Sequence, residues 1–174
     1  YSYVYNSGNK TNCGASGQNT PCYSYYSWDA ATLGSGRTIS TNDTDAPHSI
    51  CPKGWRLPTD TTSNASAYTS PNWKTGDNYK LATAYGANLE SSHYDNSSAT
   101  GANFYNNAGP GTTPNFLLAG LYYDGSFYSG GSSGNYWSRS LGTSNINRAY
   151  GLRFDSSDIS TSTYYRYYGP SVRP

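Results

Sequence analysis

Tyrosine is the residue that most constrains what this chain can fold into. The 174-residue sequence contains 20 tyrosines, and only 34% of its residues are hydrophobic even when these tyrosines are counted. Because aliphatic side chains are scarce, Tyr must contribute to the core, to the walls of the fold and to its surface. The length suits one domain, residues 1–174, and the composition predicts a shallow, loop-rich fold. The aromatic share of 16% argues against disorder, since disordered chains are poor in aromatic residues.

Charge is sparse and balanced along the chain. Charged residues make up 12% of the sequence, and 11 basic residues face 10 acidic ones. A nucleic-acid binder carries a dense basic surface, so we expect no nucleic-acid partner. The sequence has no run of about 18 apolar residues, so we expect no membrane contact within this segment. Because it opens with Tyr1 and contains no Met, we expect a mature or excised segment whose signal peptide or anchor lies outside it.

The three cysteines predict at most one disulfide within the chain. In a secreted polar domain, the loop from Cys13 to Cys22 is typical of a disulfide-closed turn, worth about 2 to 3 kcal/mol in loop entropy. Cys51 is then left as a buried thiol, an intermolecular partner, or the partner of a cysteine beyond this sequence. Spacing alone leaves a bond between Cys22 and Cys51 open.

Two helices are predicted in the first half of the chain. Residues 27–33 suit a short helix with Ser27 as N-cap and Gly34 as the stop signal. Residues 78–89 carry apolar side chains at i, i+4 and i+8, and Asp77 can cap the start.

Short runs separated by Gly and Ser predict strands beyond Pro114. In residues 148–154, large apolar groups alternate with small or charged ones, which is the signature of a half-buried strand. Turns are expected at residues 124–125 and 130–134. The five predicted strands are residues 115–123, 126–128, 135–140, 148–154 and 164–173. The chain is therefore expected to be α+β, with two short helices, antiparallel C-terminal strands and long loops.

Four motifs, in this order, resemble the Fibrobacter succinogenes major paralogous domain family. They are residues 26–31, residues 50–59 with the specific element Cys-Pro-x-Gly-Trp-x-Leu-Pro, residues 136–140 with Tyr-Trp-Ser, and residues 168–173 with Ser-Val-Arg. The resemblance spans nearly the whole chain. It implies a C-type-lectin-like fold, related to the formylglycine-generating sulfatase-modifying fold, on secreted or surface-anchored bacterial proteins. Some relatives look like pilin-type proteins of very small bacteria that live attached to other cells.

The chain departs from this family at two positions. Members commonly read Ser-Val-Arg-Cys where this sequence ends in Pro174, which implies that Cys51 lacks its usual partner. Arg139 stands where a second Ser is common, so a long cation replaces a small strand residue.

Four large apolar residues are expected to form the core. Pro52 and Pro58 bracket a turn that can direct side chains between them inward. The expected core residues are Trp28, Trp55, Leu57 and Trp137.

Residue patterns of known catalytic and metal sites are weak here, so we expect no enzyme activity, no metal and no cofactor. Ser132 lies in a Gly-x-Ser-x-Gly match, but strand sequence follows where a nucleophile elbow needs a helix. His48 and His93 lack metal-ligand spacing. Asp155 and Asp158 are the best pair of carboxylates, and we interpret them as turn formers.

Relatives of the resembled fold use two further chemistries that we also do not expect. The oxidase activity of formylglycine-generating enzymes needs paired cysteines in the C-terminal part, and no cysteine follows Cys51. Calcium-dependent lectins hold calcium with Glu-Pro-Asn or Gln-Pro-Asp, and the strings at residues 70–72 and 113–115 lack the leading carboxylate or amide.

Tyrosines concentrate in residues 122–128 and 164–168. Tyr provides large, stiff, amphipathic contact area at small entropic cost, and antibody paratopes combine it with Ser, Gly and Asn as this chain does. In a strand, half of the tyrosines face inward and half remain available. We expect a binding face made of Tyr122, Tyr123, Tyr128, Arg139, Tyr165 and Tyr167.

Three functions remain compatible with such a face. We expect an extracellular or cell-surface adhesion module that binds protein or glycan on another cell. One alternative is a subunit or tip of a pilus-like filament that binds copies of itself, which an upstream pilin-like hydrophobic helix would support. The other is a hypervariable receptor of a diversity-generating retroelement, which shares the resembled fold and which a template repeat in the gene would support.

Overall fold

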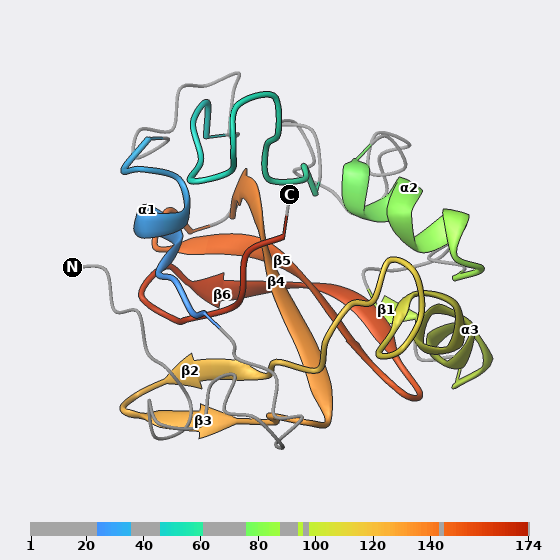
Figure 1. Ribbon diagram of the computed structural model, residues 1–174. Helices are drawn as coiled ribbons and strands as arrows, with labels where there is room; N and C mark the ends of the chain where they lie inside the picture. The colour runs from blue at the N-terminus through green and yellow to red at the C-terminus, as the bar shows by residue number, and fades with distance from the viewer. Residues whose placement is uncertain are drawn as a thin grey trace, which may run out of the picture.

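The computed structural model describes residues 24–35, 46–60, 76–87, 94–95, 98–142 and 145–173 (Figure 1). In this part of the chain, no helix is long and apolar enough to cross a membrane. The elements are α1 (Trp28–Ala31), α2 (Asp77–Ala84), β1 (Tyr94–Asp95), α3 (Ser98–Ala108), β2 (Leu121–Tyr123), β3 (Ser126–Tyr128), β4 (Ser133–Leu141), β5 (Arg148–Asp155) and β6 (Ile159–Tyr165).

The strands form two antiparallel sheets. The larger has the order β1-β6-β5-β4, and the smaller is the hairpin of β2 and β3. With its few short helices, this arrangement confirms the predicted α+β class.

The larger sheet is covered on both faces. Adjacent residues of a strand point to opposite sides, so neighbouring residues of β4 enter different cores. Tyr136 of β4 packs with Phe154 of β5, in a core that also includes Phe104 of α3 and residues of α2. The next residue, Trp137, belongs to a second core with Trp28 of α1 and Leu57. Figure 1 shows α1 on one side of the sheet, and α2 and α3 on the other.

The first predicted helix is confirmed and shorter than expected. The Ser27 hydroxyl accepts a hydrogen bond from the Ala30 amide at 3.3 Å, as an N-cap does. The helix ends at Ala31, and Leu33 and Gly34 follow with positive φ angles of 54° and 72°. The helix therefore ends before the predicted stop at Gly34, and the left-handed turn begins one residue earlier, at Leu33.

The second predicted helix also exists, but both predicted ends are wrong. It ends at Ala84, and the Ala87 amide returns to the Ala82 carbonyl at 2.9 Å. Asp77 is the first helical residue and does not cap, since Gly76 holds the N-cap position. Its carboxylate instead accepts a hydrogen bond from the Thr59 amide at 2.9 Å. This contact with a distant residue replaces the capping bond that the local sequence predicted. Residues 88–90 lie outside the described residues.

Helix α3 was not predicted. Its sequence contains Gly101 and several Asn residues, which are poor helix formers. Phe104 and Ala108, four residues apart, are fully buried on one face. Phe104 packs against Phe154 with ring centroids 5.1 Å apart, so burial against the sheet offsets the weak local propensity.

The strand predictions are accurate in the middle and wrong at both ends. β3 coincides with residues 126–128, and β4 and β5 contain the predicted segments. The turn between β2 and β3 is confirmed, with positive φ at Asp124 and Gly125. In residues 115–123 only the last three form a strand, in residues 164–173 only the first two do, and β1 was not predicted. β6 begins at Ile159 in a Ser- and Thr-rich run whose pairing with β5 decides its conformation.

Three of the four expected core residues are buried. Trp28, Leu57 and Trp137 have no exposed surface, which confirms their predicted role. Trp55 is 65% exposed, so its prediction is wrong. Its amide closes a turn onto the Pro52 carbonyl at 2.9 Å, and this turn leaves the indole outside while Leu57 points inward.

The predicted disulfide between Cys13 and Cys22 lies outside the described residues. Cys51 is a free, half-buried thiol packed against the second core.

Candidate functional site

Five tyrosines from distant parts of the chain form one connected group, which we call the tyrosine cluster: Tyr123, Tyr128, Tyr165, Tyr167 and Tyr168. Tyr168 is at its centre, with ring centroids 4.2 Å from Tyr123, 5.1 Å from Tyr167 and 5.6 Å from Tyr165. Tyr128 joins through Tyr123 at 5.5 Å, and Tyr165 stacks on Tyr167 at 5.4 Å. These separations are those of favourable aromatic pairs, so each ring restrains its neighbours.

Two backbone hydrogen bonds bring the two halves of the cluster together. The Tyr122 amide donates to the Gly169 carbonyl at 3.1 Å, and the Gly169 amide donates to the Tyr122 carbonyl at 2.8 Å. A Cβ at residue 169 would lie 3.0 Å from the Cβ of Tyr122 and 3.2 Å from that of Tyr25. The absence of a side chain at Gly169 therefore lets the β2–β3 hairpin approach the segment that carries Tyr168.

Arg166 anchors the segment between Tyr165 and Tyr168 to α1. Its guanidinium forms an ion pair with Asp29 and lies 4.9 Å from the Trp28 ring centroid. Its carbonyl accepts from the Trp28 amide at 2.8 Å, and its own amide donates to the Asn147 carbonyl at 2.9 Å. The turn is closed by the Tyr168 amide on the Tyr165 carbonyl at 2.9 Å. The segment that carries Tyr167 and Tyr168 is thus tied to α1 and to Asn147.

Exposure within the cluster is graded. Tyr167 is 68% exposed and Tyr128 is 46% exposed, while Tyr123, Tyr165 and Tyr168 are half-buried between them. Two projecting rings are thus packed against three half-buried rings.

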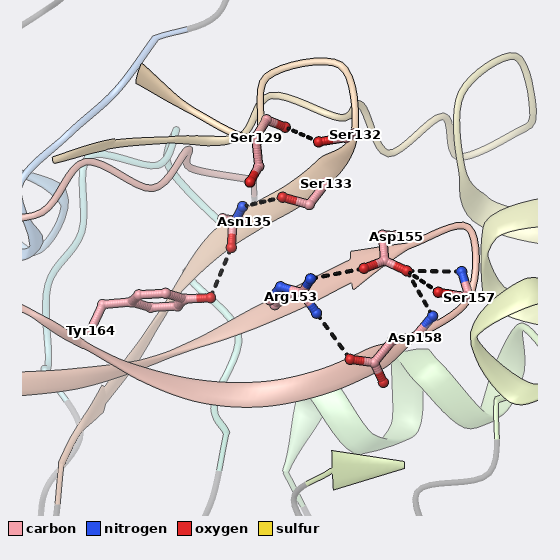
Figure 2. Close-up of polar contacts among 9 residues, drawn as sticks. All are labelled: Ser129, Ser132, Ser133, Asn135, Arg153, Asp155, Ser157, Asp158 and Tyr164. Atoms are coloured by element: carbon pink, nitrogen blue, oxygen red, sulfur yellow. Dashed lines mark hydrogen bonds and ion pairs between the residues drawn. The ribbon is translucent and has the colours of Figure 1, made fainter. Parts of the chain in front are cut away.

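The predicted alternation of inward and outward tyrosines holds at the end of β6. Tyr164 packs on Trp137 at 5.9 Å, and its hydroxyl donates to Asn135 Oδ1 at 2.8 Å. Figure 2 shows this bond and its continuation from Asn135 to Ser133. Tyr165, the next residue, lies in the cluster with the Arg148 guanidinium 4.3 Å from its ring centroid.

The Tyr168 hydroxyl stays protonated at physiological pH. Burial is the main cause that raises its pKa above the usual 10.0, and a hydrogen bond with Tyr123 and the neighbouring tyrosines add to the shift. The centre of the cluster is therefore a neutral hydrogen-bonding group, and Arg148 at its edge supplies the positive charge.

Four of the six predicted binding residues come together, and two lie elsewhere. Tyr123, Tyr128, Tyr165 and Tyr167 are in the cluster. Tyr122 points to the other side of its hairpin and packs on Phe127 at 5.3 Å. Arg139 is half-buried in β4, where its amide donates to the Pro58 carbonyl at 2.9 Å.

Sequence reasoning missed two residues of this site. Tyr168 was already inside the Tyr-rich run at residues 164–168, so the composition signal was present. Arg148 carries no such signal. It reaches Tyr165 because the two residues are partners in the register of β5 and β6.

The paired carboxylates of Asp155 and Asp158 close the β5–β6 turn (Figure 2). Asp155 Oδ1 accepts from the Ser157 amide, the Ser157 hydroxyl and the Asp158 amide at 2.8, 2.9 and 2.8 Å. Arg153 bridges both carboxylates, at 2.8 Å to Asp155 and 2.9 Å to Asp158. The Asp155 carboxylate is thus confirmed as a turn former, whereas Asp158 contributes its amide to the turn and its carboxylate to Arg153.

The two carboxyls have oppositely shifted pKa values. Burial raises the pKa of Asp155, but the hydrogen bonds from Ser157 and Asp158 and the charge of Arg153 outweigh it, so the pKa is lowered from 3.8. Burial also raises the pKa of Asp158, and here the opposing charge of Arg153 is too weak to reverse it. Both pKa shifts therefore follow from the hydrogen bonds of the turn, the charge of Arg153 and burial.

Replacing Asp155 with Ala is expected to destabilise the fold by about 1–3 kcal/mol near pH 7, because three hydrogen bonds and an ion pair are lost. A lowered native pKa gives stability that is present above the unfolded pKa and is lost as pH falls, so the difference from wild type should shrink toward about pH 3. Urea unfolding at both pH values measures it. Asp155→Asn keeps an acceptor oxygen and should lose less. A difference that does not change with pH would show that charge is not its source.

Ser132 lies in a turn, and the two histidines lie elsewhere in the chain. The Ser132 hydroxyl donates to the Ser129 carbonyl at 3.0 Å, and Ser132 is exposed in the turn before β4 (Figure 2). His48 is exposed, and His93 lies outside the described residues. Within the described ranges, no group of three or more His, Cys, Asp or Glu residues could hold a metal.

Comparison with protein-family models, with curated proteins and with solved structures finds no match. A functional conclusion therefore has to be argued from the site itself.

Proposed function

We propose that this protein is a non-enzymatic recognition domain that binds protein or glycan through the tyrosine cluster. One observation carries the proposal: five tyrosines from two distant segments join into one supported aromatic surface whose outermost rings, Tyr128 and Tyr167, are 46% and 68% exposed. A chain with so few apolar side chains gains more stability by burying such rings. Exposed aromatic residues on a rigid support are typical of binding hot spots.

The chemistry of the cluster fits a partner that is polar on its surface and has flat apolar patches. Ring faces stack on sugar rings or on side chains, and the hydroxyls and the Arg148 cation provide hydrogen bonds and charge. We further propose that the domain acts outside the cell or on its surface, as one domain with a disulfide between Cys13 and Cys22.

A C-type-lectin-like fold, and membership of the Fibrobacter succinogenes major paralogous domain family, are part of this proposal. Support comes from the way the motifs that carry the resemblance meet on three consecutive residues of β4. The three hydrogen bonds are Trp28 Nε1 to the Ser138 carbonyl, the Arg139 amide to the Pro58 carbonyl, and the Trp137 amide to the Ser171 carbonyl, each at 2.9 Å. Motifs that form one structural unit are expected to persist together within a family.

The test is a binding screen of the domain on glycans and host-cell surfaces. Tyr128→Ala with Tyr167→Ala removes the two projecting rings, and we expect at least about a tenfold loss of affinity, the effect of losing about 1.4 kcal/mol. Trp55→Ala is the matched control, because Trp55 is as exposed as Tyr167 and does not belong to the cluster. Circular dichroism should show that both variants are folded.

Two outcomes would contradict the proposal. One is a partner whose affinity falls in the Trp55 variant and is unchanged in the double Tyr variant. The other is no binding to any surface together with self-association in sedimentation, which would favour the filament subunit.

A further inference from the structure

A cavity of about 460 Å³ lies between α2 and the face of the larger sheet that packs on α2 and α3. Its volume is in the range of small-molecule sites. Its apolar wall is made by Leu81 of α2, Leu152 of β5, and Phe116. In Figure 1, α2 lies away from the β2–β3 hairpin, so this cavity is separate from the tyrosine cluster.

Positive charge is in excess at the edge of the cavity. Arg56, Lys80 and Arg173 line it together with a single carboxylate, Asp77. Asp77 is already engaged, since it pairs with Arg56 at 3.0 Å and accepts from the Thr59 amide at 2.9 Å. Lys80 is exposed on α2 and belongs to no ion pair among the described residues. A net attraction for an anion remains after the internal pair is formed.

Arg173 is held so that it can present its charge to the cavity. Its guanidinium donates to the carbonyls of Pro114 and Asn115, and its centre lies 4.3 Å from the Phe116 ring centroid. No carboxylate contacts it among the described residues. Phe116 therefore forms part of the apolar wall and also contacts the guanidinium of Arg173.

A buried amide adds a polar group to the same cavity. Asn78 is 1% exposed and lines the cavity. Its Nδ2 donates to Asp60 Oδ1 at 3.1 Å, whereas its Oδ1 has no hydrogen-bond partner among the described residues. Because this oxygen is fully buried, the cations at the edge of the cavity are the groups that can reach an acid.

We propose that this cavity binds a small organic acid with an apolar, aromatic-sized body. The body packs between Leu81, Leu152 and Phe116, and the acid group lies at the edge with the cations. Arginine guanidinium groups match the geometry of a carboxylate, and Lys80 adds a point charge. An apolar pocket with a few convergent polar groups is the usual form of a small-molecule site.

Titration calorimetry with 2-naphthoate tests the proposal, with 2-naphthamide as the neutral molecule of the same shape. We expect saturable one-to-one binding of the carboxylate and at least about tenfold weaker binding of the carboxamide. Lys80→Gln should lower the affinity for 2-naphthoate several-fold and leave the affinity for 2-naphthamide unchanged. Equal affinity for the two molecules, or no saturable binding at millimolar concentration, would overturn the proposal.

A second pair of variants locates the site. Ala84→Phe places a ring at a residue that lines the cavity and should abolish binding. Thr83→Phe adds the same ring at the preceding exposed residue of α2, which does not line it, and should leave binding intact. Equal binding by these two variants would place the naphthoate elsewhere and reject the cavity. Should the Ala84 variant fail to fold, the Lys80 variant still decides the role of charge.

Discussion

Replacing Trp137 with Ala is expected to lower the free energy of unfolding by about 3–5 kcal/mol, the usual cost of removing a fully buried large aromatic side chain. Trp137 has no exposed surface and lies in the second core with Trp28 and Leu57. Its Nε1 donates to the Tyr26 carbonyl at 2.7 Å, and Tyr164 packs edge-on against its ring at 5.9 Å. A cavity at this position removes contacts from α1, from the 46–57 segment and from β6 together.

The size of this effect is large for a domain of this kind. Natural domains have about 5–15 kcal/mol of total stability, so the variant would have much of its margin removed. Urea unfolding followed by near-ultraviolet circular dichroism measures the change. Trp137→Phe is the control, because it keeps most of the ring volume and loses the hydrogen bond to Tyr26, at an expected cost of about 1–3 kcal/mol. A loss below about 1 kcal/mol in the Ala variant would contradict the placement of Trp137 in the core.

The same substitution should also weaken the proposed binding through the tyrosine cluster in molecules that remain folded. Tyr164 rests on Trp137 and is followed directly by Tyr165 of the cluster. Loss of this support is expected to loosen the Tyr165–Tyr168 segment. Binding should therefore fall more in the Ala variant than in the Phe variant.

Replacing Gly101 with Ala is expected to destabilise the protein by about 2–4 kcal/mol, although Ala is the better helix former by about 1 kcal/mol. Gly101 is in α3, and a Cβ there would meet the backbone of Ser157 and Asp158 far inside van der Waals contact. Backbone atoms cannot move aside as the end of a flexible side chain can. The steric cost is therefore expected to exceed the gain in helix propensity.

The sign of the change in stability shows whether the steric cost or the gain in helix propensity is larger. Asn106→Ala, at an exposed position of the same helix, should be neutral or slightly stabilising, because only propensity acts there. Thermal unfolding of both variants measures the difference. If Gly101→Ala proved as stable as Asn106→Ala, the close packing of α3 on the β5–β6 turn would be disproved.

Local signals identified several elements because the signal and the structure act over the same few residues. Ser27 marks the start of α1 by capping, and Gly34 lies in the left-handed turn that follows its end. Asp124 and Gly125 accept the positive φ angles of a tight hairpin. These preferences belong to the backbone and side chains of a few neighbouring residues, so no distant partner is needed to express them.

Other parts required partners that are far away in the sequence. Trp55 looks like a core residue by type, and its exposure follows from the direction of one turn. The helix α3 depends on burying Phe104 against Phe154. The Asp77 carboxylate bonds to the Thr59 amide and does not cap α2. Propensity carries no information on which surface an element will meet, so these outcomes could not be predicted locally.

The sequence by itself determined the kind of surface this protein can offer: scarce aliphatic residues, abundant Tyr and few charges give an aromatic, hydroxyl-rich surface. Tertiary structure alone decided which tyrosines act together. The bonds between Tyr122 and Gly169 and the register of Arg148 with Tyr165 select Tyr168 as the centre and leave Tyr122 and Arg139 outside. Composition is a property of the chain, whereas a binding face is a set of distances between residues that only packing brings together.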